Sequence, residues 1–146
     1  MSIFSSFSIS ASGLTAEKLR LDLIANNIAN MNTAGRLNDP ANPPYCRKIP
    51  VFEQILERAC AGGSPRANYR GVGVRVAQIF EDPRAPRLAY EPSDPLADDQ
   101  GYVAYPNINM VNEMVNMISA TRSYEANVTA LNAAKDIALK ALEIGR

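Results

Sequence analysis

The chain has 146 residues, 47% of them hydrophobic, with 15 basic residues, 15 acidic residues and no histidine. This length fits one domain, and the balanced charge argues against the clustered positive surface on which nucleic-acid binding depends. No stretch approaches the roughly 18 apolar residues of a membrane span. The first residues lack the basic start, apolar core and cleavage site of a signal peptide. We therefore expect no nucleic-acid partner, no membrane span and no cleaved signal.

The N-terminal segment, residues 1–35, is expected to form a long helix. Large apolar residues recur in it every seven positions, at Phe7, Leu14, Leu21 and Ile28. The steps between them are filled by Ala11, Ile24 and Ala25. This is a heptad seam whose small members let a partner helix approach closely. Serines 8, 10 and 12 offer N-caps, and the helix should end near residues 30–32, before a glycine at position 35.

An amide-rich block, Asn26, Asn27 and Asn30, lies near the end of this helix. Asparagine is a poor helix former, so three within five positions need a reason. One explanation is a polar helix end with an asparagine C-cap. The other is a packed multi-helix tube, in which amides satisfy neighbouring polar groups where charges would be too costly to bury.

The middle, residues 36–106, contains all ten prolines and separates the helices. Residues 51–58 fit a short helical turn or a strand equally well. Residues 71–80 alternate and are β-branched, which predicts a strand, and residues 87–90 are expected to return as its hairpin partner. Cys46 and Cys60 are either two small semi-buried thiols or, in an oxidising compartment, a disulfide that contributes about 3 kcal/mol.

The C-terminal segment, residues 107–146, predicts a second long helix that opens after Pro106, with Asn107 or Asn109 as its cap. One heptad track consists of Met110, Met117, Tyr124, Leu131 and Ala138. A second consists of Met114, Thr121, Val128, Lys135 and Leu142. We expect a mainly α fold with a small β element, in which the long terminal helices pack as an antiparallel coiled coil and a short Pro/Gly-rich middle contains a β-hairpin.

A rough energy comparison indicates when the terminal helices become ordered. Full burial of the four large seam residues of the first helix would contribute about 6–12 kcal/mol. Fixing its roughly 23 backbone units costs about 1–2 kcal/mol each before hydrogen bonds are counted. One facing helix covers only part of the seam. We therefore expect poorly ordered termini in an isolated monomer and ordered helices where several copies surround them.

The sequence argues against an enzyme. Without histidine, the commonest general base is missing, and neither cysteine can form a Cys–His pair. The acidic pairs at 81–82 and 98–99 are typical of turns on a solvated loop. The Gly71-Val72-Gly73 run lacks the third glycine and the following helix of a nucleotide-binding loop. No catalytic, cofactor or metal site is predicted.

Two segments carry a resemblance to a known family. Residues 25–33 read Ala-Asn-Asn-Ile-Ala-Asn-Met-Asn-Thr, and residues 113–127 read Glu-Met-Val-Asn-Met-Ile-Ser-Ala-Thr-Arg-Ser-Tyr-Glu-Ala-Asn. They resemble the paired terminal signatures of the bacterial flagellar axial proteins, the rod and hook proteins. The middle, at residue 45 and at residues 47–52, 73–76, 82–83, 86–88, 90–92 and 101–107, is similar to that of short proximal-rod subunits.

This resemblance implies a structural subunit of the flagellar basal body that helps to transmit motor torque. It would be exported by the flagellar type III apparatus without a cleaved signal and located in the periplasmic rod. Its partners would be copies of itself, other rod proteins and an inner-membrane ring or rod-adaptor protein. The expected assembly interface consists of Phe7, Leu14, Leu21, Asn26, Asn27, Ile28, Asn30, Met114, Met117, Tyr124, Glu125, Asn127, Val128, Leu131 and Leu142. The alternatives are another short rod subunit and a cytoplasmic coiled-coil adaptor.

Overall fold

The computed structural model describes residues 3–37, 42–58 and 69–144, and Cys60 lies outside them. The long elements are α1 (Ile3–Ala29), β1 (Lys48–Arg58), β2 (Tyr69–Glu81) and α2 (Met110–Ile144). Two short strands, β3 (Arg87–Tyr90) and β4 (Tyr102–Tyr105), lie between β2 and α2. The strands form two antiparallel two-stranded sheets, β1–β2 and β3–β4. The expectation of a mainly helical fold with a small β element is confirmed.

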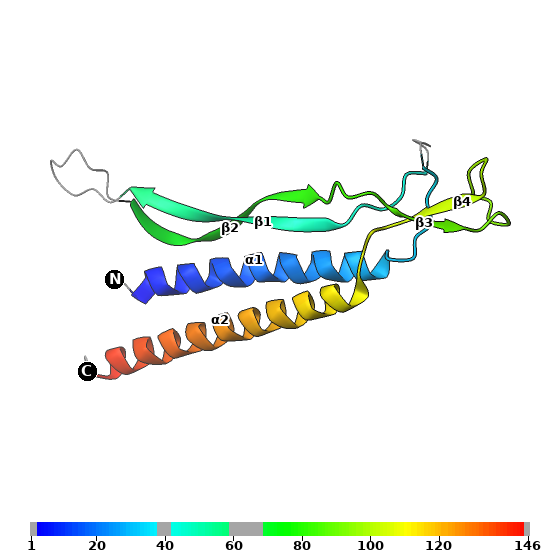
Figure 1. Cartoon of the computed structure of the whole chain (residues 1–146). Helices are drawn as coiled ribbons and strands as arrows, with labels where there is room; N and C mark the ends of the chain where they lie inside the picture. The colour runs from blue at the N-terminus through cyan, green and yellow to red at the C-terminus, as the bar shows by residue number, and fades with distance from the viewer. Residues whose placement is uncertain (1–2, 38–41, 59–68, 145–146) are drawn as a thin grey trace.

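The elements are stacked in three layers, with α1 in the middle (Figure 1). One side of α1 contacts the β1–β2 hairpin and another contacts α2. The two helices run antiparallel, so the N- and C-termini lie at one end of the molecule and the β3–β4 sheet lies at the other. The antiparallel side-by-side arrangement predicted for the terminal helices is therefore confirmed, whereas coiled-coil packing stays a proposal.

The ends of the helices follow local chemistry. α1 begins at Ile3, so serines 8, 10 and 12 lie inside the helix and do not cap it. Ser12 is accommodated there because its hydroxyl donates to the Ile9 carbonyl three residues earlier, at 2.7 Å. At the start of α2, the side-chain oxygen of Asn109 accepts the Asn112 N–H at 3.2 Å, which confirms one of the two predicted caps.

The prediction that residues 71–80 pair with residues 87–90 in a hairpin was wrong. β2 pairs with β1, from Lys48 opposite Glu81 to Arg58 opposite Tyr69, so residues 51–58 are a strand. The pairing ends at Asp82, whose N–H donates to the Arg47 carbonyl and whose carboxylate accepts the Arg84 N–H in a turn. Pro83 cannot continue a ladder because it has no N–H. Residues 87–90 therefore begin a separate sheet and pair with residues 102–105.

Close approaches to α1 depend on two glycines. Gly73 on β2 has φ of 147°, and a Cβ there would collide with the Ser12 hydroxyl. A Cβ on Gly13 of α1 would stand only 3.0 Å from the Asn127 side-chain oxygen of α2. Among the residues that the structure describes, the buried apolar side chains are few and mostly small or medium-sized, namely Ala16, Leu23, Ile24, Val103, Ala104 and Ala120. The subunit thus has a thin core.

Candidate assembly interface

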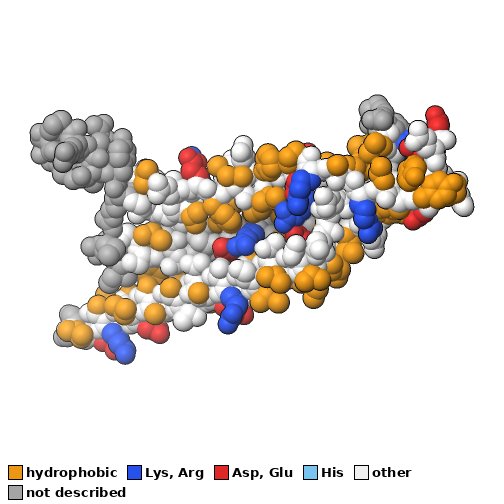
Figure 2. Space-filling view, in the orientation of Figure 1, with side chains coloured by type: hydrophobic (Ala, Val, Ile, Leu, Met, Phe, Trp, Pro, Cys, Tyr) orange, Lys and Arg blue, Asp and Glu red, His pale blue; other side chains and the backbone are white. Residues whose placement is uncertain are grey.

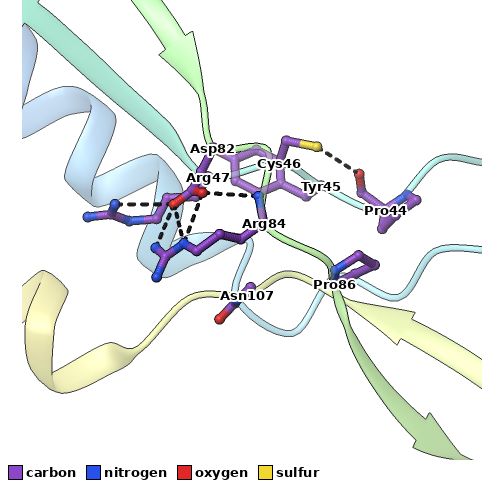
Figure 3. A pocket seen from close by; sticks show the side chains of 8 residues that line it. All are labelled: Pro44, Tyr45, Cys46, Arg47, Asp82, Arg84, Pro86 and Asn107. Carbon is purple, nitrogen blue, oxygen red and sulfur yellow. Dashed lines mark hydrogen bonds and ion pairs between the residues drawn. The ribbon is translucent and has the colours of Figure 1, made fainter.

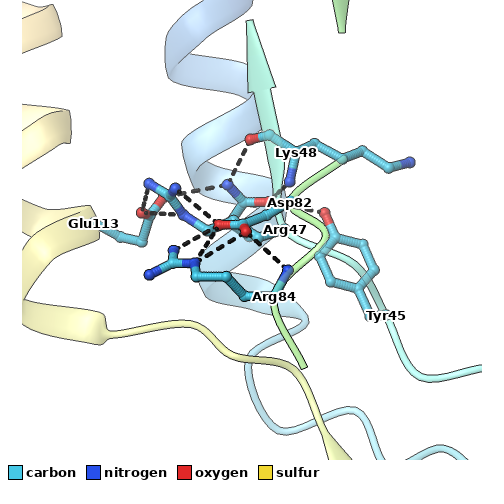
Figure 4. Close-up of polar contacts among 7 residues, drawn as sticks. Tyr45, Arg47, Lys48, Asp82, Arg84 and Glu113 are labelled. Carbon is cyan, nitrogen blue, oxygen red and sulfur yellow. Dashed lines mark hydrogen bonds and ion pairs between the residues drawn. The ribbon is translucent and has the colours of Figure 1, made fainter. Parts of the chain in front are cut away.

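A buried polar cluster joins four segments that are far apart in the sequence. We call it the polar junction and define it as Asn27 at the end of α1, Arg47 before β1, Asp82 after β2 and Glu113 in the first turn of α2. Figure 4 shows the side chains of Arg47, Asp82 and Glu113 converging where the helices meet the base of the hairpin. Because the segments are separated by up to 86 positions, the junction fixes the two helices and the hairpin in one arrangement.

The centre of the junction is the Glu113 carboxylate, which is only 1% exposed. Arg47 donates to its Oε1 from Nε at 2.9 Å and from Nη2 at 2.6 Å. Asn27 donates to its Oε2 from Nδ2 at 3.2 Å. A buried carboxylate is tolerated only where it is paired and hydrogen-bonded, and removing its partner is strongly destabilising. Arg47 and Glu113 therefore act as one unit.

Asn27 is also only 1% exposed, and its side-chain amide forms all of its hydrogen bonds with groups of the same chain. Its Nδ2 donates to the Lys48 carbonyl at 2.9 Å as well as to Glu113, and its Oδ1 accepts the Lys48 N–H at 2.9 Å. The Tyr45 hydroxyl donates to the same Oδ1 at 3.1 Å. Burial raises the pKa of the Tyr45 phenol, and the nearby Glu81 carboxylate raises that pKa further. The amide thus mimics a strand partner and holds the start of β1 against α1.

The Asp82 carboxylate of the junction also pairs with Arg84, which lies outside the junction. Arg84 donates from Nε to both oxygens of Asp82, at 2.9 and 3.0 Å, and Arg47 lies 3.6 Å from the same carboxylate. These contacts, with the Arg84 hydrogen bonds first, lower the pKa of Asp82 to about 2. A cavity beside the pair is lined by Pro44, Tyr45, Cys46, Arg47, Asp82, Arg84, Pro86 and Asn107 (Figure 3). At about 30 Å³ it is the size of one water molecule and too small for a substrate.

The predicted interface residues separate into three groups by exposure. Asn27 alone is fully buried. Half-buried side chains are Phe7, Leu14, Leu21, Ile28, Asn30, Met117, Tyr124, Asn127, Val128 and Leu131. Exposed side chains are Asn26, Met114, Glu125 and Leu142. The apolar side chains buried deepest on α1 are Ala16, Leu23 and Ile24, of which only Ile24 belongs to the predicted seam, because α1 contacts the hairpin and α2 at once.

Large apolar side chains remain exposed along α2. At its start they are Met110, Val111, Met114, Val115 and Ile118, and at its end Ile137, Leu139, Leu142 and Ile144. Figure 2 shows hydrophobic surface at both ends of this helix. The hairpin exposes Val51, Phe52, Leu56, Ile79 and Phe80. Extended apolar surface of this kind marks protein–protein contact.

The sequence does not predict the junction, because no pattern in it indicates a role for Arg47 or a partner for Glu113. Glu113 had one visible signal, its position in the first turn of a helix, where the helix dipole favours an acidic residue. Nothing local indicates that this acid is buried against an arginine 66 positions away. Within the described residues, no three acidic or cysteine side chains form a group that could hold a metal ion. No helix among the described residues is long and apolar enough to cross a membrane.

Two antiparallel terminal helices with exposed apolar surface are typical of a subunit that assembles with others. The similarity to known proteins agrees with this interpretation. Residues 7–35 match the flagella basal body rod protein family, and residues 99–144 match the C-terminal region of the flagellar basal body rod FlgEFG proteins. The class is therefore that of flagellar basal-body rod proteins, which agrees with the expectation that the chain is not an enzyme.

The full-length relatives are more specific. The chain is 43% identical to the flagellar basal-body rod protein FlgC of Bacillus subtilis, with 100% of both chains covered. It is 42% identical to FlgC of Yersinia enterocolitica and 40% identical to FlgC of Salmonella typhimurium, again over 100% of each chain. The chain belongs to the FlgC family.

Proposed function

We propose that this chain is a structural subunit of the proximal rod in the flagellar basal body, where it assembles with its own copies and with related axial proteins and transmits motor torque. Family membership supports the basal-body rod. The observation that carries the assembly role is the surface of α2, where Val111 is 68% and Ile144 is 86% exposed although the polar junction beside the helix start is complete. Side chains of this size are stabilised when a neighbouring subunit covers them.

The finer parts of the proposal concern the chain's organisation. We assign residues 1–35 and 107–146 to a two-helix core that packs as a coiled coil in the rod, and residues 36–106 to a Pro-rich middle that contains a β-hairpin. The interface would use the half-buried and exposed residues grouped above. Asn27 would act indirectly, because its four hydrogen bonds stay within the chain. It would orient the hairpin that neighbours contact.

The remaining partners follow from the location. A subunit of the periplasmic rod has to leave the cytoplasm, and we propose the flagellar type III apparatus as its route, without a cleaved signal. At the base of the rod it would contact an inner-membrane ring or rod-adaptor protein. Membership of a rod family favours this function over the cytoplasmic coiled-coil adaptor.

The test places a charge in the proposed helix contacts. Leu21→Glu and Leu131→Glu each put a carboxylate at a half-buried position that neighbours would cover, at a cost of several kcal/mol. The matched control is Gln100→Glu, in an exposed loop before β4. We expect both leucine variants to be synthesised but to leave cells without rods and non-motile, while the control swims. Normal motility of the leucine variants at normal protein levels would contradict the proposed contacts.

A further inference from the structure

α2 carries an outer face that nothing in the described chain covers. Val111, Val115 and Ile118 follow one another at steps of three and four, so they form one stripe, with Met114 at its side. The same steps continue to Arg122 and Glu125, which are also exposed. We call this stripe the α2 outer face. It is apolar over its first two turns and then carries a positive and a negative charge in that order.

α1 carries a second unpartnered stripe, the α1 outer face, at Lys18, Asp22, Ala25 and Ala29. All four residues are exposed and are again separated by three or four positions. Lys18 and Asp22 border an apolar groove between α1 and β2, lined by Ala16, Leu19 and Val76 among others. This stripe also carries a positive charge and then a negative one along the chain.

Among the residues that the structure describes, none forms an ion pair with the four charges on these faces, Lys18, Asp22, Arg122 and Glu125. The ion pairs of the described residues involve other side chains, such as Arg20 with Glu17 and Arg75 with Glu53. Exposed charges set the orientation and register of a contact more than they set its strength. The order of positive and negative charges along the two faces therefore determines whether parallel or antiparallel docking of one helix on the other is attractive.

We propose that the α2 outer face of one copy docks antiparallel on the α1 outer face of the next copy, with Arg122 opposite Asp22 and Glu125 opposite Lys18. Parallel docking at the same height would set Arg122 against Lys18 and Glu125 against Asp22, which is repulsive at both positions. This proposal deepens the function proposed above and rests on it, because it names which surfaces of neighbouring subunits meet.

The apolar residues support the same register. With Arg122 opposite Asp22, Ile118 lies opposite Ala25 and Val115 lies opposite Ala29, since both helices advance 1.5 Å per residue. Large side chains thus meet small ones, which allows a close helix–helix approach. The two faces belong to different helices, so a copy can offer one face to each of two neighbours. Such a heterologous contact builds an open helical array when the rotation between neighbours does not close into a ring.

The decisive experiment is a charge reversal with rescue, read as the yield of basal bodies. Glu125→Lys or Lys18→Glu alone turns one attraction into a repulsion, and we expect each contact to weaken about fivefold. The chain that carries both changes restores the pair with inverted sign and should return to near the wild-type yield. All of these positions are exposed, so the purified variants should keep the wild-type helix content and melting temperature.

A cross-linking arm tests the geometry directly. In a chain with Cys46→Ser and Cys60→Ser, an Asp22→Cys copy and an Arg122→Cys copy expressed together should form a disulfide-linked dimer in isolated rods. Asp22→Cys with Asp136→Cys, fourteen positions further along α2, is the control and should not cross-link. Single reversals with wild-type yield, a double reversal as poor as the singles, or equal cross-linking of both pairs would overturn the docking while leaving the rod function intact. Complete basal bodies in cells that lack this chain would instead overturn the proposed function.

Discussion

The two ends of the helix pair differ in their polar contacts, although α2 exposes large apolar side chains at both ends. At the end where α1 stops and α2 starts, the polar junction is closed, and no buried side-chain nitrogen or oxygen of the described residues lacks a hydrogen-bond partner. At the other end, the last turns of α2 expose Ile137, Leu142 and Ile144. The same two helices thus have a fully hydrogen-bonded polar junction at one end. At the other end they have an apolar surface that the subunit leaves uncovered, which we call the unfinished end.

This difference teaches how a subunit with a thin core can still have a defined shape. Buried ion pairs contribute little net stability, because desolvation offsets their attraction, but they tolerate few alternative arrangements. The junction therefore determines where the hairpin lies relative to the helices. The exposed end of α2 contributes little until it is covered. The junction thus sets the shape of the subunit within one chain, and contacts with neighbouring chains add the stability that the exposed end of α2 lacks.

The change with the largest expected effect removes the arginine of the junction. Arg47→Ala leaves the Glu113 carboxylate buried without its main partner, and we expect a loss of about 3–5 kcal/mol in the free energy of unfolding. Urea denaturation of the purified subunit measures it. The matched control is Arg75→Ala, which breaks the exposed pair with Glu53 and should cost no more than about 1 kcal/mol. Equal losses would show that the junction is no more important than a surface ion pair.

A smaller loss is expected from a change of one amide. Asn27→Asp replaces the two donated hydrogen bonds by a carboxylate that faces the Lys48 carbonyl and the Glu113 carboxylate. Unsatisfied buried groups cost about 1–3 kcal/mol, and a charge costs more. Asn26→Asp, on the exposed side of the same helix, is the control and loses a single bond to the Asp22 carbonyl. Urea midpoints of the two variants should differ clearly, and matching midpoints would return the amide block to a polar helix end.

The smallest expected effect is on the stability of the subunit at low pH, through the carboxylate of Asp82. The pKa of Asp82 falls from an ordinary 3.8 to about 2 in the folded chain, so its ionised form adds stability above about pH 4. That contribution is lost as the pH falls from about 4 towards 2, because the unfolded state then binds the proton first. In Asp82→Asn, the stability measured between pH 5 and pH 2 should fall less steeply than in the wild type. Parallel curves would rule out Asp82 as a source of the acid sensitivity.

The sequence predicts the helices well and the strand pairing poorly, for a physical reason. Helix periodicity is local, so the long helices and the Asn109 cap could be found, whereas the serines expected to cap the first helix lie inside it. The partner of β2 depends on competition between two segments, and residues 51–58 had no pattern that separated a strand from a helical turn. Since β1 also follows a proline-rich stretch, only its contacts with α1 and with β2 identify it as the partner.

The candidate site was predictable only in part, for a related reason. Apolar heptads mark the exposed α2 positions Met114 and Leu142, and the amide block points to Asn27. The sequence suggested that this block satisfies polar groups of packed helices, and the structure gives Asn27 partners within its own chain. Arg47 and Glu113 could not be paired from the sequence, because charged residues are usually exposed and nothing local indicates their burial.

The most direct test of the unfinished end is amide hydrogen exchange of the verified monomer and of assembled rods. Rapid exchange over residues 1–35 and 110–146 of the monomer follows from the energy comparison, and the structure predicts a gradient within them. Residues 137–144 should exchange fastest, and residues 16–27, packed against the hairpin and α2, slowest. In rods, residues 137–144 should become strongly protected. Protection of these residues in the monomer that equals their protection in rods would contradict the claim that neighbouring subunits complete this end.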